Sequence, residues 1–176
     1  PSRDKANLNE AFVLKFDDTV SLDENQWPGP DVLPGFREEI TAYSDKMERL
    51  GKRLLPVFAT ALDMQPTHFD EAFINPTWRL RMTHYPAMQG KSQDEFGIAP
   101  HVDTCFCTIL AQDQPGLTIY SERRKKWIKA PLIDNGFIVN SGELLRQWTN
   151  DRFLSVKHFA NNDISGQSRY SIPFFL

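Results

Sequence analysis

The 176-residue sequence has the length of one ordinary domain, and its 40% hydrophobic and 24% charged residues are typical of a soluble globular protein. A net charge of −3 gives no cationic excess that would indicate nucleic-acid binding. No apolar run approaches the ~18 residues of a membrane helix, and no signal peptide opens the sequence. We therefore expect a cytoplasmic protein that binds neither nucleic acid nor membranes.

The first half of the chain has a helical pattern. Ala11–Phe16 is expected as a short edge strand, and Leu33–Asp63 as one amphipathic helix, because apolar residues recur there at intervals of three and four. The apolar face comprises Phe36, Ile40, Tyr43, Met47, Leu50, Leu54 and Leu55. Pro56 is expected to kink this helix or end it one turn early. The stripe is too short for a coiled coil, so we interpret it as a scaffold helix. A second, short helix is expected over Phe69–Phe73.

After Trp78 the pattern changes to short alternating stretches separated by turn residues, which predicts β-strands. The expected strands are Arg79–Tyr85, Cys105–Ala111, Leu117–Ser121, Trp127–Lys129, Gly136–Asn140, Val156–Ala160 and Arg169–Phe175. Strands of this length and spacing indicate a sandwich or jelly roll. The basic cluster Arg123–Lys126 is interpreted as a solvated hairpin tip, with a phosphate or polyanion contact as the alternative.

Cys105 and Cys107 are the two cysteines of the chain, and they lie two residues apart on a predicted strand. Such neighbours rarely have disulfide geometry. With no second cysteine pair, they do not indicate a zinc site either. We expect two reduced thiols, as in cytosolic proteins.

Three residues have the spacing of a facial metal triad. His101 and Asp103 are two apart, which suits a strand end, because alternate residues of a strand face the same side. His158 follows 55 residues after Asp103 and would have to come from a second strand folded back beside the first. Two imidazoles and one carboxylate leave positions open, as a non-heme Fe(II) oxygenase requires. An isolated histidine is more often structural, and this is the interpretation for His68 and His84.

The wider pattern is more specific than the H-x-D triplet. It consists of His101-x-Asp103, Thr108-x-Leu110-x-Gln112-Asp113, Gly116-Leu117, Trp127, Asn140-x-Gly142-Glu143, Trp148-Thr149-Asn150, His158, Arg169-x-Ser171 and Phe174-Phe175. With this pattern the chain resembles the 2-oxoglutarate/Fe(II)-dependent dioxygenase superfamily, in its isopenicillin N synthase-like branch. The resemblance is close over Arg79–Leu176 and looser over Asn9–Leu62.

The resemblance implies a mostly β fold with flanking helices, in which a double-stranded β-helix (jelly roll) core packs against the long N-terminal helix. It implies a single oxygenase domain over residues 1–176, with a helical support region at 1–76 and a catalytic core at 77–176. Because the chain starts at Pro1 without Met and stops on a predicted strand, we expect it to lack parts of the N- and C-terminal extensions found in relatives.

The resemblance also implies the site residues. His101, Asp103 and His158 would bind Fe(II). Arg169 would bind the distal carboxylate of the cosubstrate 2-oxoglutarate, because a guanidinium takes a carboxylate in bidentate fashion. Ser171, two residues further on the same strand face, would donate another hydrogen bond. O2 is the remaining cosubstrate.

A few positions qualify the resemblance. Tyr85 matches a family tyrosine that hydrogen-bonds the same carboxylate, and Thr83 stands where many relatives have Asn. Phe159 and Ala160 replace the usual Arg and branched residue after the distal histidine, which affects the pocket wall and not the metal. The presence of Asp103 argues against halogenation, because halogenating relatives lack this carboxylate.

The expected activity is hydroxylation or desaturation of a small-molecule substrate, with release of succinate and CO2. One alternative is an Fe(II)-dependent oxidase of the same fold that uses the Arg-x-Ser pair for a substrate carboxylate and needs no 2-oxoglutarate. Another is a non-catalytic binding module, against which the intact triad of His101, Asp103 and His158 argues. The sequence defines neither the substrate nor the oligomeric state.

Overall fold

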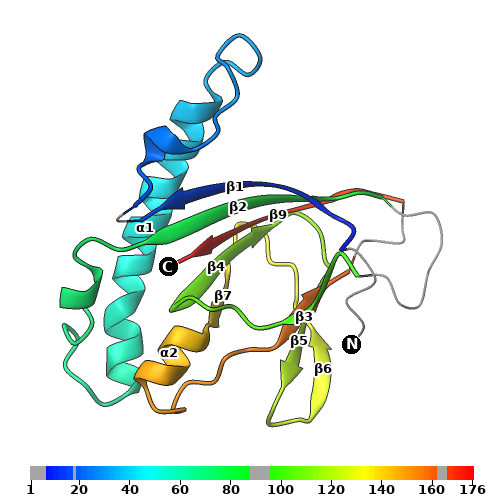
Figure 1. The fold of residues 1–176 in the computed structure, drawn as a ribbon. Helices are drawn as coiled ribbons and strands as arrows, with labels where there is room; N and C mark the ends of the chain where they lie inside the picture. Colours follow the sequence, from blue (N-terminus) through cyan, green and yellow to red (C-terminus); the bar gives the residue numbers. More distant parts are fainter. Residues whose placement is uncertain (1–6, 18, 88–95, 162–165) are drawn as a thin grey trace. The chain divides into compact units, whose positions relative to one another are not determined.

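The computed structural model describes residues 7–17, 19–87, 96–161 and 166–176 (Figure 1). The chain divides into two compact units. The first comprises Pro1–Phe12 with Arg81–Pro173, and the second comprises Val13–Leu80 with Phe174–Leu176.

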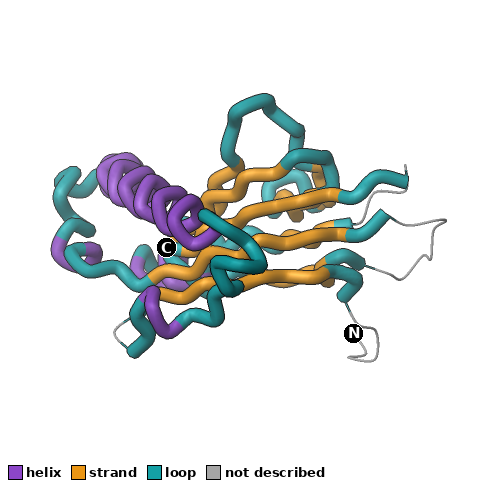
Figure 2. Tube along the Cα trace, turned by 90° about the horizontal axis from the view of Figure 1, so that it is seen from above, coloured by secondary structure: helices purple, strands orange, loops and turns teal. Residues whose placement is uncertain are grey.

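Nine strands form two sheets within the described residues. They are β1 (Glu10–Phe16), β2 (Trp78–Tyr85), β3 (Ile98–His101), β4 (Cys107–Gln112), β5 (Leu117–Ser121), β6 (Lys126–Lys129), β7 (Ile138–Ser141), β8 (His158–Ala160) and β9 (Arg169–Phe175). The larger sheet has the order β1-β2-β9-β4-β7, and the smaller one β3-β8-β5-β6. Figure 2 shows the strands as extended segments lying side by side. The strand β1 lies at a sheet edge, as expected.

The first unit has an apolar interior to which both sheets contribute. Leu110 of β4 packs with Leu117 of β5 and with Ala130, and Ile119 and Ile138 lie against this cluster. Both sheets contain antiparallel strand pairs, such as β4–β7 in the larger sheet and β5–β6 in the smaller one. Two antiparallel sheets that share a core are the essence of a jelly roll, so the expected mostly β, double-stranded β-helix fold is confirmed.

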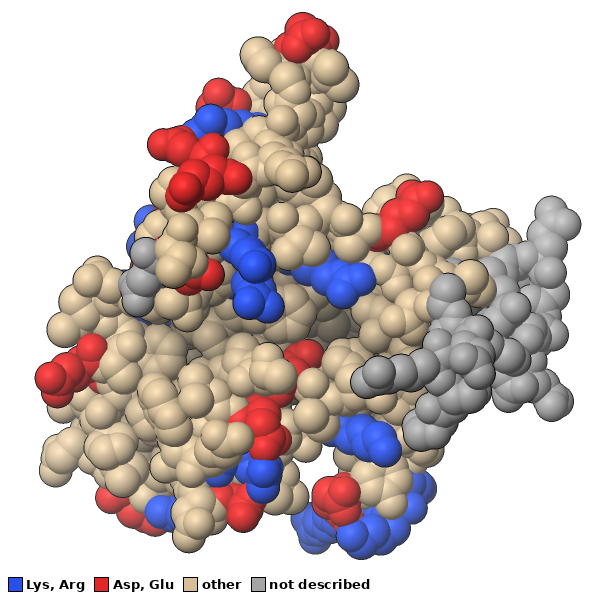
Figure 3. Space-filling view, viewed as in Figure 1, with Lys and Arg blue, Asp and Glu red and all other residues tan. Residues whose placement is uncertain are grey.

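The turn between β5 and β6 carries the basic cluster Arg123–Lys126, whose residues are all exposed (Figure 3). Lys125 Nζ lies 2.7 Å from Glu122 Oε2 within the same turn. The expected hairpin tip is therefore present, and its charges face solvent.

The second unit contains the long helix α1 (Phe36–Ala61), which begins after Gly35 in a left-handed conformation with φ of 77°. Its buried residues are Ser44, Met47, Gly51, Leu55 and Ala59. Met47 and Leu55 belong to the apolar face expected from the sequence, but three small residues complete the buried stripe. A hydropathy pattern misses these positions because small side chains are buried through close approach of the backbone, not through their own hydrophobicity.

Of the two effects expected of Pro56, an early end of the helix is wrong, since α1 continues to Ala61, and a kink stays a prediction. A proline removes one backbone donor from the helical ladder. The long run of helix before Pro56 outweighs this loss, and the Pro56 carbonyl accepts a hydrogen bond of 2.8 Å from the Thr60 hydroxyl.

The strand β3 was expected only as a strand end at His101 and without bounds, because it is four residues long and contains Pro100, which argues against strand structure. The helix α2 (Glu143–Trp148) was missed because six residues are too few for a helical period to show. The short helix expected over Phe69–Phe73 is a 3-10 turn, η2 (Glu71–Phe73), and a similar turn, η1, spans Leu22–Glu24. No helix within the described residues is long and apolar enough to cross a membrane.

Trp78 is the centre of the aromatic packing in the second unit. Its ring stacks on Phe16 at 5.5 Å and lies 5.3 Å from the ring of Phe174. Its indole N–H donates a hydrogen bond of 3.1 Å to Glu48 Oε2 of α1. One side chain thus connects the helix with parts of β1, β2 and β9 that belong to this unit.

Replacing Trp78 with Ala is expected to lower the free energy of unfolding by about 3–5 kcal/mol, because it removes a 4% exposed aromatic side chain and leaves a cavity. Trp78→Phe keeps an aromatic ring but loses the bond to Glu48, and a smaller loss is expected. Urea denaturation of the three proteins measures both values. A loss of less than about 1 kcal/mol for Trp78→Ala would contradict this role.

Candidate active site

The two triad histidines lie on neighbouring strands of the smaller sheet. His101 is the last residue of β3 and His158 the first of β8, and the antiparallel pairing places them directly opposite each other. Their ring centroids are 4.3 Å apart. Asp103 follows two residues after β3 ends, so the H-x-D pair straddles the strand end. The sequence-based expectation of a second strand folded back beside the first agrees with this pairing.

Each of the three residues offers a ligand atom to the same point. These atoms lie within 4.8 Å of one another. Asp103 Oδ1 is 3.6 Å from Nε2 of His101 and 3.6 Å from Nε2 of His158. The His101 side chain is 38% exposed and that of His158 12% exposed, so the cluster meets solvent mainly on the His101 side.

Backbone carbonyls fix the orientation of both imidazoles. His101 Nδ1 is 2.8 Å from the Ala99 carbonyl oxygen, and His158 Nδ1 is 2.7 Å from that of Val156. Because a carbonyl oxygen only accepts, each neutral ring carries its proton on Nδ1 and presents the lone pair of Nε2 toward Asp103. Such a second hydrogen bond is the usual partner of a metal-binding histidine.

Asp103 is 7% exposed and uses its two oxygens differently. Oδ1 faces the imidazoles. Oδ2 accepts hydrogen bonds from the Thr108 hydroxyl at 2.6 Å and from the Asn140 amide at 2.9 Å. The carboxylate therefore has one oxygen committed to the protein and one directed to the histidine cluster.

The electrostatics of the cluster suit a cation. Burial raises the pKa of Asp103, but the hydrogen bond with His101, the charge of His158 and the donors Thr108 and Asn140 outweigh it and lower the pKa to about 2. Burial lowers the pKa of both histidines. For His101 the hydrogen bonds to Asp103 and Ala99 outweigh burial, so its pKa is raised. For His158 burial dominates, so its pKa is lowered. The ionised Asp103 thus favours positive charge on His101, and a metal ion at this point would take the place of the proton that His101 Nε2 otherwise gains.

The loop that carries Asp103 is held by the start of α2. The backbone N–H of Glu143 donates to the Asp103 carbonyl at 2.8 Å, and that of Leu144 donates to the Cys105 carbonyl at 3.2 Å. A Cβ at Gly142 would lie 2.1 Å from the Cys105 carbonyl oxygen. Glycine is therefore required at this position for the loop and the helix to approach each other.

The two cysteines of this region are reduced thiols and form no disulfide. Burial, reinforced by the proximity of Cys105, raises the pKa of Cys107 to about 12. A thiol that stays protonated at physiological pH is a poor nucleophile and a poor metal ligand. Cys107 thus behaves as a core residue of β4.

Arg169, on β9, is a 1% exposed cation, and only some of its hydrogen-bond donors have acceptors. Its Nε donates to the Gln114 carbonyl at 3.1 Å and its Nη2 to Gln112 Oε1 at 3.0 Å. Its guanidinium carbon lies 4.7 Å from the centre of the Tyr85 ring, in cation–π geometry. Its Nη1 is buried without a hydrogen-bond partner among the described residues, and so is the hydroxyl of Thr83.

A buried hydrogen-bond donor without a partner lowers the stability of the folded protein, and the loss is larger when the donor belongs to a cation. Thr83 and Tyr85 alternate on β2, and Arg169 and Ser171 alternate on β9, the neighbouring strand. All four residues are buried. This stretch of the larger sheet therefore has spare hydrogen-bonding capacity and positive charge, which match a small carboxylate.

Gly116 lies against Arg169 and leaves room for it. A Cβ at Gly116 would lie 2.8 Å from Arg169 Cδ and 2.9 Å from both Arg169 Nε and the Asn161 carbonyl oxygen. Its φ of 155° is also one that side chains rarely adopt. The Gly116-Leu117 element of the sequence pattern thus has a physical reason in the seating of Arg169.

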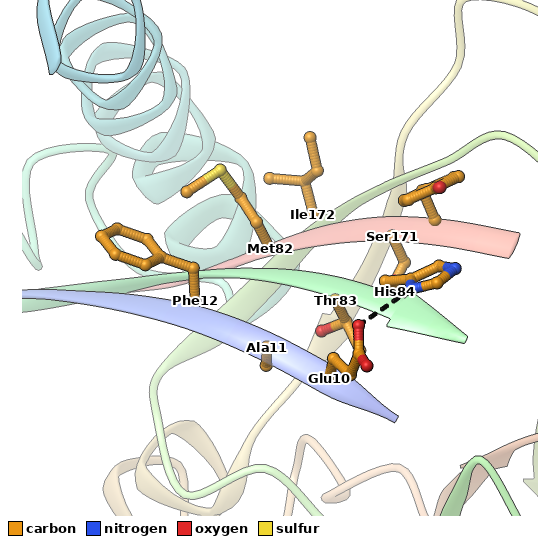
Figure 4. Close-up of a pocket in the computed structure, with 9 residues that line it drawn as sticks. Glu10, Ala11, Phe12, Met82, Thr83, His84, Ser171 and Ile172 are labelled. Carbon is orange, nitrogen blue, oxygen red and sulfur yellow. Dashed lines mark hydrogen bonds and ion pairs between the residues drawn. The ribbon is translucent and has the colours of Figure 1, made fainter. Parts of the chain in front are cut away.

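A depression of about 460 Å³ lies on the outer side of β1, β2 and β9 (Figure 4). The side chains of Phe12, Met82 and Ile172 form its apolar floor, and Figure 4 shows them on the opposite face of the sheet from Thr83. At its edge His84 Nδ1 is 3.2 Å from Glu10 Oε2. This depression is separate from the triad and from the Arg169 side chain.

The chain matches the model of the 2OG-Fe(II) oxygenase superfamily over residues 76–176. It is 37% identical over 157 residues to the 2-oxoglutarate-Fe(II) type oxidoreductase hxnY of Emericella nidulans, covering 86% of this chain and 44% of that protein. It is 29% identical over 174 residues to the 2-oxoglutarate-dependent dioxygenase thnC of Trichoderma harzianum, covering 94% of this chain and 53% of that one.

Among solved structures, a full-length Neurospora crassa protein in complex with alpha-KG and thymine superposes with a TM-score of 0.86. The two are 26% identical, and the match covers 97% of this chain and 54% of the Neurospora chain. The chain thus spans about half the length of these relatives. It belongs to the 2OG-Fe(II) oxygenase superfamily, so the resemblance inferred from the sequence is confirmed. The class has Fe(II), 2-oxoglutarate and O2 as its cofactors, and the relatives are consistent with the isopenicillin N synthase-like branch.

Sequence reasoning named six site residues, and the structure distributes them in two groups. His101, Asp103 and His158 form the cluster at the β3–β8 pair. Tyr85, Arg169 and Ser171 lie on the neighbouring strands β2 and β9. Four further residues were quoted in the sequence pattern without a role, and the structure places each against one of these groups. They are Thr108, Gln112, Gly116 and Asn140.

Replacing Gly142 with Ala is expected to displace the loop of Asp103, because the added Cβ overlaps a backbone carbonyl that has no flexible side-chain end to move. The free energy of unfolding should fall by more than about 1 kcal/mol. Gly136→Ala, in an exposed loop where the nearest atoms are 3.1 Å away, is the control and should cost less. Equal values for the two variants in urea denaturation would contradict the close approach described here.

Proposed function

We propose that this chain forms the catalytic core of an Fe(II)- and 2-oxoglutarate-dependent dioxygenase that hydroxylates or desaturates a small-molecule substrate, with release of succinate and CO2. The observation that carries the proposal is the buried Nη1 of Arg169, which has no partner within the described residues, in a chain that also presents a His-Asp-His cluster. An oxidase without 2-oxoglutarate would not need this pocket unless its substrate supplied the carboxylate.

His101, His158 and Asp103 are proposed to hold the iron through two Nε2 atoms and Oδ1. Neutral imidazoles with a single carboxylate suit ferrous iron, and three protein ligands leave further positions open. Bound iron and 2-oxoglutarate together supply the oxidising chemistry that activates O2 and attacks a substrate C–H bond. The role of the three side chains is to direct two imidazole nitrogens and one ionised carboxylate oxygen to the same point, which the carbonyl contacts of both histidines and the low pKa of Asp103 support.

Arg169, Ser171 and Tyr85 are proposed to bind the distal carboxylate of 2-oxoglutarate, with Thr83 as an additional donor. Two nitrogens of Arg169 are already bonded to residues 112 and 114, so the fork is held rigidly and Nη1 remains for the ligand. Preorganised donors of this kind bind a carboxylate without reordering the side chain. Because all four residues are buried, the pocket also excludes water from the bound anion.

The substrate class is proposed from the comparisons. The Neurospora crassa structure contains thymine, a small molecule, and the curated relatives are oxidoreductases of the same class. We propose a small-molecule substrate for this chain as well, with no role for nucleic acid or membranes and with a cytoplasmic location. We also propose that residues 1–176 are one oxygenase domain with 1–76 as its support region and 77–176 as its catalytic core.

The test is an anaerobic titration of the intact protein with Fe(II) and then with 2-oxoglutarate, followed by visible absorption. A charge-transfer band is expected when the 2-oxo acid binds beside the iron. In Arg169→Ala the band should be absent at the same concentrations, because the distal carboxylate loses its charged partner. Arg79→Ala, which removes an exposed arginine of β2, should behave as the wild type.

The alternatives give different outcomes in the same titration. Iron binding without a band in the wild type would favour the oxidase. If neither the wild type nor His158→Ala binds iron, a non-catalytic module would be favoured and the proposal overturned.

Gly116→Ala is expected to weaken 2-oxoglutarate binding by roughly tenfold or more, about 1.4 kcal/mol, because the new Cβ displaces the Arg169 side chain. Iron affinity should stay within about twofold of the wild type, since the atoms nearest to the new Cβ belong to Arg169 and Asn161. Gly136→Ala serves as the control. Loss of iron binding in Gly116→Ala would show that the two sites are not separable in this way.

A further inference from the structure

Thr108 and Asn140 occupy one cross-strand pair of the larger sheet. Thr108 on β4 is the direct Cα partner of Asn140 on β7. Both side chains donate to the same atom, Asp103 Oδ2, at 2.6 and 2.9 Å. Cross-strand partners are the closest side-chain neighbours in a sheet, so these two donors act on Oδ2 from one rigid support.

The directions of these hydrogen bonds are fixed. A carboxylate only accepts, so the Thr108 hydroxyl must donate its single proton to Oδ2. Cys105 Sγ lies 3.3 Å from Thr108 Oγ1 and is placed to donate to it. Thr108 is 3% exposed, so no bulk water competes for the hydroxyl. Hydrogen bonds to a charged acceptor in such surroundings are stronger than bonds between neutral groups.

We propose that Thr108 and Asn140 form a clamp that keeps Asp103 a one-oxygen metal ligand. This inference rests on the proposed function, in which Asp103 binds iron. A carboxylate with both oxygens free can turn and offer both of them to a metal, closing a position that the cosubstrate or O2 needs. Here, turning Asp103 in this way breaks two hydrogen bonds and leaves the buried Thr108 hydroxyl and the half-buried Asn140 amide without this acceptor. Both residues are positioning residues, because they act through Asp103.

The α2 start supports the clamp from the backbone side. The Glu143 N–H holds the Asp103 carbonyl at 2.8 Å, while the clamp holds the side chain. Asp103 is thus fixed at its backbone and at its side chain, by Thr108 close by in the sequence and by Asn140 and Glu143 from a distant segment. This arrangement removes the rotational freedom through which a carboxylate changes its mode of coordination.

The test uses the shape-matched variant Thr108→Val, the conservative variant Thr108→Ser, and Asn140→Leu. Thr118→Val, on β5 and 9% exposed, is the control for a threonine-to-valine change in a buried strand position. Co(II) replaces iron as the probe, because the intensity of its visible absorption depends on the number and arrangement of its ligands. Each protein is titrated anaerobically with Co(II), and the absorption is measured before and after 2-oxoglutarate is added.

The clamp predicts that Thr108→Val and Asn140→Leu bind Co(II) roughly 10- to 100-fold more weakly and give a changed absorption intensity before 2-oxoglutarate is added. Their spectra should respond less to 2-oxoglutarate. Thr108→Ser and Thr118→Val should match the wild type, since the first keeps the hydroxyl and the second lies outside the site.

Three results would overturn the inference or its basis, and they are distinguishable. If the wild type binds Co(II) and 2-oxoglutarate and Thr108→Val has the same spectrum and affinity, the clamp is wrong while the proposed function stands. If Thr108→Ser is as impaired as Thr108→Val, the residue acts through packing of its methyl group and not through the hydroxyl. If the wild type binds no Co(II), the proposed function itself fails.

Discussion

The antiparallel pairing of β3 with β8 is the constraint on which the site depends. It places His101 opposite His158, and the carbonyls of Ala99 and Val156 then orient both rings toward Asp103. A shift of the pairing by one residue would turn one histidine to the other face of the sheet. The convergence of the three side chains is therefore a consequence of strand register more than of any single side chain.

A second constraint is the burial of Arg169. A guanidinium that is 1% exposed is stable only when its surroundings supply acceptors. Gln112 and the carbonyl of residue 114 supply two, the Tyr85 ring supplies a π face, and one nitrogen has no partner among the described residues. The carboxylate that we propose to bind here would relieve this residual cost by pairing with the free nitrogen.

Much of the fold and the site followed from the sequence. The limits of Leu117–Ser121 and Arg169–Phe175 were predicted as the structure has them, because alternation and turn residues bound these strands clearly. The six residues proposed for the site were selected through the family pattern, and not through periodicity. Composition alone would have left His101 and His158 among four histidines of equal standing.

What the sequence did not show depends on long-range register. Asn140 lies 37 residues from Asp103, and its hydrogen bond exists because β4 and β7 place it beside Thr108. The role of Gly116 depends likewise on how closely β9 brings Arg169. The small residues buried on α1 escaped a hydropathy pattern for a similar reason, since burial there is set by the partner surface.

The most direct test of the account is anomalous diffraction at the iron edge from crystals of the protein grown anaerobically with Fe(II). The account predicts one peak at bonding distance from His101 Nε2, His158 Nε2 and Asp103 Oδ1, with Asp103 Oδ2 still hydrogen-bonded to Thr108 and Asn140. A peak elsewhere, or one bonded to both oxygens of Asp103, would contradict it.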